Sequence, residues 1–315
     1  GILMKGSNYL ELLSKVEIAA FDKTGTLTRG EFSVTSLDCA EGVSQEQLLE
    51  TAAYCESQST HPLAKSILKA YGKPVDGSRI AGIEEVSGNG IRAVFDGKKA
   101  LVGKPELLNG VPVTQQPAGT TAVYVALDGQ YLGCIGLSDT LKPDTKDAVG
   151  ALRKLGLHNL TMLSGDRQPT AEAIAKEIGL DNAWGQLLPE EKVSHLEELK
   201  KLGSVVYAGD GINDAPVLAA ADVGVAMGGL GSDAAMEAAD VVIMTDEISR
   251  LPLAIRIARR TMSIARQNII FSIAVKILIL VLSLIVDLGL WLAVFADVGV
   301  CMLAILNSLR ALHTK

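Results

Sequence analysis

The stretch FDKTGTLT, residues 21–28, carries a single carboxylate where an apolar run stops. Val16, Ile18 and two alanines precede Phe21, a composition that is typical of a buried strand. Asp22 follows, and a lysine, two threonines and a glycine come directly after it. A carboxylate at the end of a buried strand, surrounded by hydroxyl groups and glycine, predicts a reactive acid at the edge of a sheet.

Similar apolar segments recur along the chain, and polar residues follow them. Together with residues 16–26 they are the segments 160–166, 204–214, 222–227 and 240–244. Helical patterns bounded by glycine or proline alternate with them, at 144–156, 168–179 and 189–203. The alternation predicts an α/β fold with a doubly wound parallel sheet, whose site lies at the carboxyl ends of the strands.

A long insertion interrupts this alternation after the first strand. More than 130 residues separate the first strand from the second, which is far more than a crossover needs. The insertion begins with a helical pattern over 48–71 and continues with segments 90–103 and 121–136, each turning on Asp-Gly between alternating apolar residues. We expect an α/β domain at 32–133, inserted into a core formed by 1–31 and 134–252.

Four aspartates fall at successive strand ends of the predicted core: Asp22, Asp166, Asp210 and Asp214. Each alone could be a helix cap or a turn acid. Acids that lie close together cannot all ionise unless a cation neutralises them, and Mg²⁺ prefers such oxygen ligands. Lys192, at the start of a helix behind this edge, supplies a fixed positive charge. The set predicts a carboxylate that attacks a phosphoryl group and carries it as an acyl phosphate.

Residues 269–309 are almost entirely apolar. The run is about twice the ~20 residues that a bilayer-spanning helix needs. A break at VDLGLW, 286–291, predicts a membrane hairpin within 253–315, with helices at about 268–286 and 290–311. Two buried helices of a soluble core are the alternative. Because basic residues flank both ends and the turn carries only Asp287, both ends are expected to be cytoplasmic. The flanking basic residues are Arg256, Arg259, Arg260, Arg266, Arg310, His313 and Lys315.

The net charge of −7 offers no support for nucleic-acid binding. The four cysteines have no paired or metal-ligand spacing, which agrees with a reducing cytosol. The chain opens on Gly1 without a start methionine and without a visible signal peptide. We therefore expect it to be a piece that begins within a longer protein.

The motif DKTGTLT resembles the phosphorylation signature of P-type ATPases, which belong to the haloacid dehalogenase-like superfamily. The resemblance extends through SGD (164–166), PEEK (189–192) and GDGINDAPVLAAADVGVAMG (209–228), with SDTLKPD (138–144) as the hinge segment. It implies that Asp22 is phosphorylated and that Asp22, the Thr24 carbonyl and Asp210 hold Mg²⁺. The other residues implied in the site are Thr24, Ser164 and Lys192 as phosphoryl contacts, Gly165 and Asp166 of the SGD motif, and Asn213 and Asp214 as support.

The residue type at the position of Thr24 distinguishes the ATPases of this superfamily from its phosphatases. Superfamily phosphatases are expected to carry a second acid two residues after the nucleophile, and this chain has Thr24 there. In the resembling ATPases a Thr-Gly-Glu loop of an actuator domain positions the attacking water, and no such sequence occurs in this chain. A membrane-tethered phosphatase and a non-enzymatic nucleotide sensor remain alternatives.

A second marker, ESQSTHP (56–62), lies in the predicted insertion and is expected on a helix. With SGNG (87–90) it resembles the nucleotide-binding set of the heavy-metal-transporting subfamily. The resemblance implies that Glu56 and His61 meet the adenine of ATP and that the two glycines allow close approach of the backbone. The implied nucleotide-binding residues are Glu56, Ser59, His61, Pro62, Gly88 and Gly90.

Two ionisable residues, Lys276 and Asp297, lie inside the predicted membrane helices. Charged groups at membrane depth are costly and usually functional, although each could instead lie near an interface. The segments AVK (274–276) and WLAVFADVG (291–299) resemble the zinc, cadmium and lead class of this subfamily rather than the copper class. The resemblance implies export of Zn²⁺, Cd²⁺ or Pb²⁺ through Asp297, with Lys276 as its counter-ion. The implied partners are membrane lipid, an actuator domain, and a Cys-Pro-Cys helix just before Gly1.

Overall fold

The computed structural model describes the chain except for residues 87, 109–110, 112–120, 211–213, 229–232, 286–290, 292–293 and 314–315. The described chain divides into two compact units. The first comprises Gly1–Asp22, Pro143–Ser164 and Ala175–Lys315, and the second comprises Lys23–Lys142 and Gly165–Ile174. The sequence predicts a core domain formed by 1–31 and 134–252 and an inserted domain at 32–133. The two compact units have other limits, and the domain boundaries stay a prediction.

The first unit is built on a seven-stranded sheet in the order β1-β13-β12-β11-β2-β9-β10. All neighbours pair in parallel except the edge strand β1, which is antiparallel to β13. The parallel sheet predicted from the sequence is therefore confirmed. The three-residue strands β1 and β10 were not predicted. The strands are β1 (Ile2–Met4), β2 (Ile18–Asp22), β9 (His158–Leu163), β10 (Asn182–Trp184), β11 (Val205–Gly209), β12 (Val223–Met227) and β13 (Val241–Ile243).

Helices cover this sheet and close its core. The predicted helices appear close to their expected limits as α4 (Thr145–Lys154), α6 (Pro189–Lys200) and α5 (Gln168–Ile178), the last of which spans the boundary between the two units. Further helices of the first unit are α1 (Ser7–Lys15), α7 (Ala215–Ala220) and α8 (Asp233–Ala238). On one face, α6 and α7 bury leucines and a valine against the strands. Strands β2, β11 and β12 are buried at every position, as strands of a covered parallel sheet must be.

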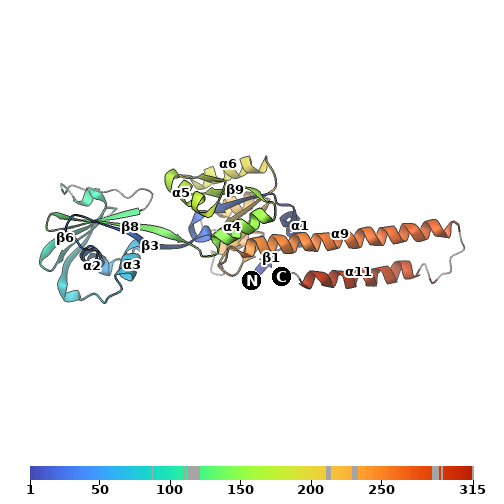
Figure 1. The fold of residues 1–315 in the computed structure, drawn as a ribbon, viewed down its shortest axis with the longest axis horizontal. Helices are drawn as coiled ribbons and strands as arrows, with labels where there is room; N and C mark the ends of the chain where they lie inside the picture. The colour runs from blue at the N-terminus through green and yellow to red at the C-terminus, as the bar shows by residue number, and fades with distance from the viewer. Residues whose placement is uncertain are drawn as a thin grey trace. The chain divides into compact units, whose positions relative to one another are not determined.

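The second unit contains a six-stranded sheet in the order β3-β8-β7-β6-β5-β4, antiparallel throughout. Two predicted hairpins are confirmed, and their Asp-Gly turns have positive φ at both residues, 48° and 75° at Asp96-Gly97 and 52° and 79° at Asp128-Gly129. The helices α2 (Gln45–Cys55) and α3 (Pro62–Tyr71) belong to this unit, and α2 packs on the sheet in a shared core (Figure 1). The strands are β3 (Thr28–Cys39), β4 (Ile80–Val86), β5 (Gly90–Phe95), β6 (Lys98–Gly103), β7 (Thr121–Leu127) and β8 (Gln130–Leu141).

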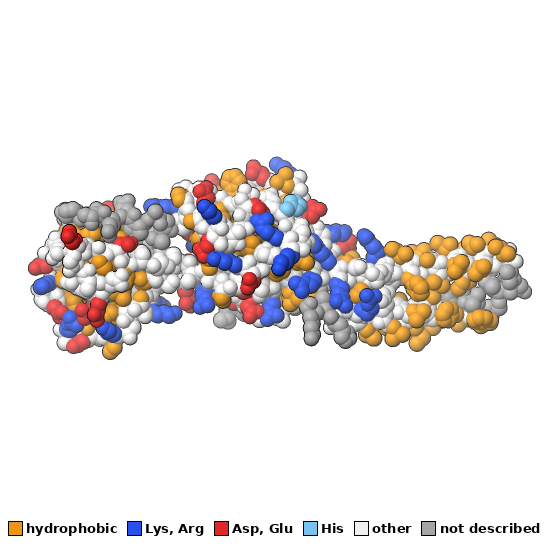
Figure 2. Space-filling view, viewed as in Figure 1, with side chains coloured by type: hydrophobic (Ala, Val, Ile, Leu, Met, Phe, Trp, Pro, Cys, Tyr) orange, Lys and Arg blue, Asp and Glu red, His pale blue; other side chains and the backbone are white. Residues whose placement is uncertain are grey.

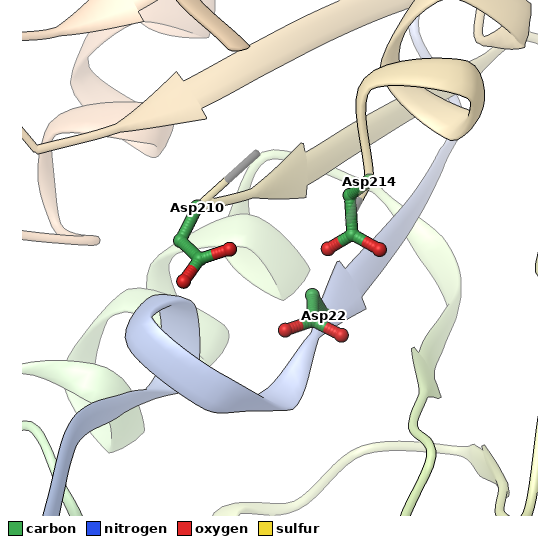
Figure 3. A group of neighbouring side chains, drawn as sticks. All are labelled: Asp22, Asp210 and Asp214. Atoms are coloured by element: carbon green, nitrogen blue, oxygen red, sulfur yellow. The ribbon is translucent and has the colours of Figure 1, made fainter. Parts of the chain in front are cut away.

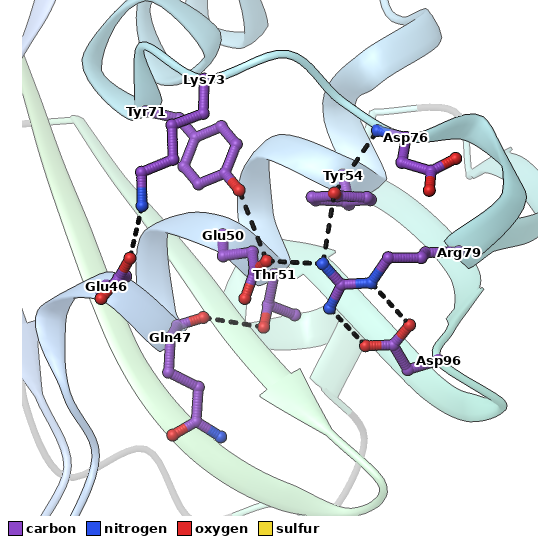
Figure 4. Close-up of polar contacts among 10 residues, drawn as sticks. All are labelled: Glu46, Gln47, Glu50, Thr51, Tyr54, Tyr71, Lys73, Asp76, Arg79 and Asp96. Carbon is purple, nitrogen blue, oxygen red and sulfur yellow. Dashed lines mark hydrogen bonds and ion pairs between the residues drawn. The ribbon is translucent and has the colours of Figure 1, made fainter.

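A polar network around Arg79 fastens the β5–β6 turn to helix α2 (Figure 4). The Arg79 guanidinium donates to both carboxylate oxygens of Asp96, at 2.9 and 2.5 Å, and to Glu50 at 2.8 Å. It also lies 4.9 Å from the ring centroids of Tyr54 and Phe95. Because a planar guanidinium can bond sideways and stack at the same time, one side chain joins the turn, the helix and the aromatic core.

Among the residues that the structure describes, one helix is long and apolar enough to cross a membrane: α9, Arg250–Ser283. The helix begins 18 residues before the membrane segment expected at about 268, and it buries Leu251, Ile255 and Ala258 in the first unit before it turns apolar and exposed. The expected limits of the membrane segment stay a prediction. A shorter apolar helical stretch, Val300–Leu312, runs beside it (Figure 1). Orange apolar side chains cover the far part of this pair (Figure 2). The elements after α9 are η5 (Phe295–Gly299), α11 (Val300–Ser308) and η6 (Leu309–His313).

Gly90 faces its cross-strand neighbour Gly103 so closely that neither has room for a side chain. A Cβ on Gly90 would lie 2.2 Å from the Val102 carbonyl oxygen, and its φ is +135°. We predict that Gly90→Ala lowers the free energy of unfolding by about 2–4 kcal/mol, through strain and overpacking together. Thermal unfolding of the chain in detergent measures the loss.

Gly88 provides the matched control for this change. It has φ +72°, and no described atom lies within 4 Å of the position its Cβ would take. Gly88→Ala should therefore cost only about 1–2 kcal/mol, the strain of a left-handed alanine. Equal losses for the two variants would contradict the assignment of a packing role to Gly90.

Candidate active site

Three carboxylates meet at the carboxyl edge of the seven-stranded sheet (Figure 3). Asp22 ends β2, Asp210 directly follows β11, and Asp214 precedes α7. Because β2 and β11 are neighbouring parallel strands, their ends bring these acids to one place. One oxygen from each carboxylate lies within 4.8 Å of the others. Asp166, the fourth acid expected from the sequence, belongs to the second unit, and its place in the site stays a prediction.

Lys192 is the cation of this cluster. Its Nζ donates to Asp22 Oδ1 at 2.5 Å and to Asp214 Oδ1 at 2.8 Å. All three side chains are at most 10% exposed. Burial would lower the pKa of Lys192, but the two carboxylates outweigh it and raise the pKa, so the ammonium stays charged. The lysine is positioned by α6, which begins at Pro189, three residues earlier.

Burial raises the pKa of Asp22 to about 7, and the neighbouring charge of Asp214 adds to the shift. Lys192 opposes both effects by attraction and by hydrogen bonding. Three carboxylates and one ammonium leave an excess of negative charge in a buried place. A divalent, oxygen-seeking cation would neutralise that excess, so the donor set fits Mg²⁺.

The loop that follows Asp22 is held by polar contacts within the second unit. Gly25 has φ +73°, and the buried Lys142 ammonium donates to its carbonyl at 2.6 Å. Thr28 contacts the carbonyl of Lys23 at 2.8 Å, and Lys23 forms a 2.5 Å ion pair with Asp166. The Asp166 carboxylate therefore has a buried lysine as its partner within the second unit. The sequence pattern assigns no role to Lys23, Thr28 or Lys142; the signals that mark them are that Lys23 and Thr28 lie in DKTGTLT and Lys142 in SDTLKPD.

The other predicted phosphoryl contacts differ in accessibility. Thr24 is exposed in the loop of the second unit. Ser164 is buried directly after β9, where its N–H donates to the Trp184 carbonyl at 2.8 Å and its carbonyl accepts from Leu187 at 3.1 Å. Gly165 follows in the second unit. Asn213 lies outside the described residues.

The nucleotide marker ESQSTHP lies in a break between two helices, not on a helix as expected. Helix α2 ends at Cys55, a 3₁₀ turn covers Glu56–Gln58, and α3 begins at Pro62. Proline has no N–H to donate and disfavours helical geometry in the residue before it, so the helix can start at Pro62 but cannot run through it. His61 is the N-cap, and its Nδ1 accepts from Leu63 N–H at 3.2 Å.

Glu56 is buried inside this break, while His61 is exposed. Burial raises the pKa of Glu56 to about 7; a hydrogen bond from Ser59 opposes the shift, and Glu85 adds to it. The Ser59 hydroxyl also accepts from the His61 N–H at 3.3 Å. Glu56, Ser59, His61 and Pro62 therefore belong to one local structure between α2 and α3. Of the two glycines, Gly88 borders open space, whereas Gly90 is required by the packing of β5 and β6.

Comparison with known proteins first defines the class. Residues 16–222 match the profile described as haloacid dehalogenase-like hydrolase. The match covers more than half of the chain and includes all three carboxylates. The chain therefore belongs to the haloacid dehalogenase-like hydrolase family.

Within this family, the similar proteins are metal-transporting P-type ATPases. The chain is 48% identical over 322 residues to a cadmium, zinc and cobalt-transporting ATPase of Bacillus subtilis, covering 100% of this chain and 46% of that protein. It is 47% identical over 316 residues to a zinc-transporting ATPase of Synechocystis, covering 98% and 44%. The chain spans about half the length of the curated relatives that it matches.

Solved structures give the same result. The crystal structure of a zinc-transporting PIB-type ATPase in its E2.Pi state matches with a TM-score of 0.90 at 37% identity, covering 99% of this chain and 52% of that one. The catalytic domain of the CPx-ATPase CopB-B matches with a TM-score of 0.65 at 32% identity, covering 81% of this chain and 95% of that one. The fold and family expected from DKTGTLT and the related motifs are confirmed.

The buried Glu56 carboxyl predicts a pH-dependent stability. Its pKa is about 7 in the folded chain against an ordinary 4.5, so the folded state holds this proton more tightly. The stabilisation is complete below about pH 4.5 and is lost as the pH rises towards 7. We predict that Glu56→Gln removes a fall of about 1–3 kcal/mol in unfolding free energy between pH 5 and pH 8. Denaturant unfolding across this pH range measures it.

Glu84→Gln is the control, because Glu84 is an exposed glutamate of the same unit. It should leave the pH dependence of the wild-type chain unchanged. If the Glu56→Gln and wild-type curves run parallel from pH 5 to pH 8, Glu56 is not the buried acid responsible.

Proposed function

We propose that the chain is the catalytic and C-terminal membrane portion of a P-type ATPase that exports Zn²⁺, Cd²⁺ or Pb²⁺. The observation that carries the proposal is the buried Asp22, bonded to Lys192 beside Asp210 and Asp214. The similarity to ATPases named for cadmium and zinc transport supports the choice of cargo. In this proposal the catalytic units are cytoplasmic, and α9 and the helical stretch after it cross a membrane.

Asp22 acts as the nucleophile. Its ionised carboxylate attacks the terminal phosphorus of ATP, the bond from that phosphorus to the bridging oxygen breaks, and ADP leaves with the electron pair. The carboxylate must be ionised to attack, and its pKa of about 7 places this state within reach at neutral pH. Lys192 favours the ionised form and then faces the phosphoryl oxygens. Mg²⁺, held by Asp22, Asp210 and the Thr24 carbonyl, would supply charge neutralisation.

Thr24 favours an ATPase over a phosphatase. A phosphatase needs a resident acid to protonate the leaving group and activate water, and an exposed threonine cannot do either. The phosphoenzyme therefore persists until a separate group positions water, which is the role we assign to an actuator domain of the same parent protein. Asn213 and Asp214 support the site, and Ser164 and Gly165 approach the transferred phosphoryl group.

The nucleotide is held by the break between α2 and α3. Glu56, Ser59 and His61 form one hydrogen-bonded unit ahead of Pro62. The exposed His61 ring can stack on or bond to the adenine, since its Nε2 is not used by the cap. Gly88 borders open space in which a nucleotide can approach the backbone.

The phosphorylation step yields the first test of this function. In the parent ATPase with ATP and Mg²⁺, we predict an acid-stable, hydroxylamine-labile phosphoprotein, because an acyl phosphate forms on Asp22. Asp22→Asn should reduce labelling to background. His61→Gln is the matched control: it should weaken ATP affinity while phosphorylation by inorganic phosphate stays nearly intact. Labelling that survives Asp22→Asn would place the nucleophile elsewhere.

The membrane pair gives the second test. Asp297 lies in the π-helical segment Phe295–Gly299, and Lys276 lies on α9. A carboxylate joined by thiolates of a Cys-Pro-Cys helix suits Zn²⁺, Cd²⁺ and Pb²⁺ better than Cu⁺, which prefers soft ligands alone. After release, Lys276 can neutralise the bare carboxylate and so avoid a buried unpaired anion.

We predict that Asp297→Ala abolishes Zn²⁺-stimulated ATPase activity of the parent protein. Lys276→Ala should keep metal binding but loosen the link between metal release and dephosphorylation. Bound-metal stoichiometry and stimulated turnover, measured for both variants in detergent or liposomes, separate these outcomes. An Asp297→Ala protein that still binds Zn²⁺ and is still stimulated by it would end this assignment.

A further inference from the structure

Arg259, on helix α9, donates to three backbone carbonyls of the first unit. Its Nε lies 3.2 Å from the Ser14 oxygen and its Nη2 lies 3.0 Å from the Val16 oxygen. Its Nη1 donates to the carbonyl of Leu155. The sequence counts Arg259 among the basic residues that flank a membrane helix, but these contacts point it into the catalytic unit instead.

The three carbonyls lie at the ends of two helices. Ser14 and Val16 are at the C-terminus of α1, and Leu155 is the C-cap of α4. The last carbonyls of a helix have no partner within it, and they carry the negative end of the helix dipole. A single guanidinium therefore completes both helix ends at once, which a lysine, with its compact charge, cannot do with the same geometry.

Each of these helix ends leads into a strand that carries a site residue. From Val16 the chain enters β2, which is buried at every position and ends on Asp22. From Leu155 it enters β9, which ends before Ser164. The two strands are paired in parallel, and each is roughly 17–20 Å long at about 3.3 Å per residue. Arg259 thus holds the amino ends of the two strands whose carboxyl ends bear Asp22 and Ser164.

Helix α9 continues from this attachment without a break into its apolar part. It runs from Arg250 to Ser283, and it packs against α1 and α4 before it becomes exposed (Figure 1). Further along, Asn268 donates to Ser308 at 2.9 Å and accepts from Asn307 at 2.8 Å. These bonds join α9 to α11. A displacement of β2 and β9 would therefore reach both apolar helices through Arg259.

We propose that Arg259 is a positioning residue that couples phosphorylation of Asp22 to the membrane helices. This inference rests on the proposed pump function. The guanidinium keeps α1, α4 and α9 in fixed register, so that the sheet edge and the membrane helix move as one body. Without it, Asp22 can still be phosphorylated, but the change at the site no longer moves α9 by the full amount.

The test uses the full-length parent ATPase in liposomes, with Arg259→Gln and Arg259→Lys. Three quantities are measured: phosphorylation by inorganic phosphate with Mg²⁺, Zn²⁺-stimulated ATP hydrolysis, and Zn²⁺ transported per ATP hydrolysed. For Arg259→Gln we expect phosphorylation by phosphate to stay within about twofold of wild type. The Zn²⁺ transported per ATP should fall at least about fivefold, the lower range of allosteric coupling between two sites. The Zn²⁺ transported per ATP by Arg259→Lys should lie between the values for Arg259→Gln and wild type.

Arg266→Gln is the matched control, an exposed arginine on the same helix, and its transport ratio should equal that of wild type. A wild-type protein without Zn²⁺-stimulated hydrolysis would overturn the pump function itself. A wild-type pump whose transport ratio is unchanged in Arg259→Gln would overturn the coupling role alone. Parallel loss of phosphorylation and transport would also overturn it, because a structural defect affects both.

Discussion

The buried contact between Lys192 and Asp22 is the interaction on which the catalytic site depends. Asp22 ends a fully buried strand beside two further carboxylates, and burial pushes its pKa upwards. A neutral carboxylic acid is a poor nucleophile, so the role proposed for Asp22 needs a fixed cation within bonding distance. Lys192 is that cation, and its own charge is maintained by Asp22 and Asp214. Each group favours the ionised form of the other, although burial still leaves the pKa of Asp22 at about 7.

The fold makes this contact possible by neighbouring strands rather than by neighbouring residues. Asp22 and Asp214 are separated by most of the chain, yet β2 and β11 pair directly and end at the same edge. Helix α6 then places Lys192 against both acids. A parallel sheet with crossover helices therefore concentrates charge at one edge, and a buried lysine limits the cost of that concentration.

Helix α9 has a buried part, which packs in the first unit, and an exposed apolar part. Its first part buries Leu251, Ile255 and Ala258 in the catalytic unit, while residues such as Ile269 and Leu280 are more than half exposed. The same helix packs in the first unit and is long and apolar enough to cross a membrane. Since it has no break between these parts, the catalytic unit and the apolar surface share one rigid element. Arg259 lies on its buried part, at the ends of α1 and α4.

The sequence alone determined the class of fold, and it named the carboxylates and the lysine that the structure brings together. Parallel strands read as apolar runs, Asp-Gly marks the hairpin turns, and the order of DKTGTLT, SGD, PEEK and GDGIND is specific. Asp22, Asp210, Asp214 and Lys192 could be named because each belongs to such a motif. Local signals of this kind survive without tertiary information, because they depend only on residues next to one another.

Tertiary structure decided what depends on contacts between distant residues. The motif pattern put Asp166 with the other acids, but the buried Lys23 holds it in an ion pair. The segment ESQSTHP was expected to be helical. A new helix begins at Pro62 instead, and Glu56 is buried in the 3₁₀ turn before it. The sequence predicts a ligand contact at Gly90, and the structure adds a packing requirement there, because a glycine on β6 faces it. The sequence places Arg259 among the basic residues that flank a membrane helix. In the structure its guanidinium donates to backbone carbonyls up to 245 positions away along the chain. No local pattern encodes the partners of Asp166 and Arg259, since long-range packing brings each pair together, whereas Pro62 is a local signal for the break in ESQSTHP.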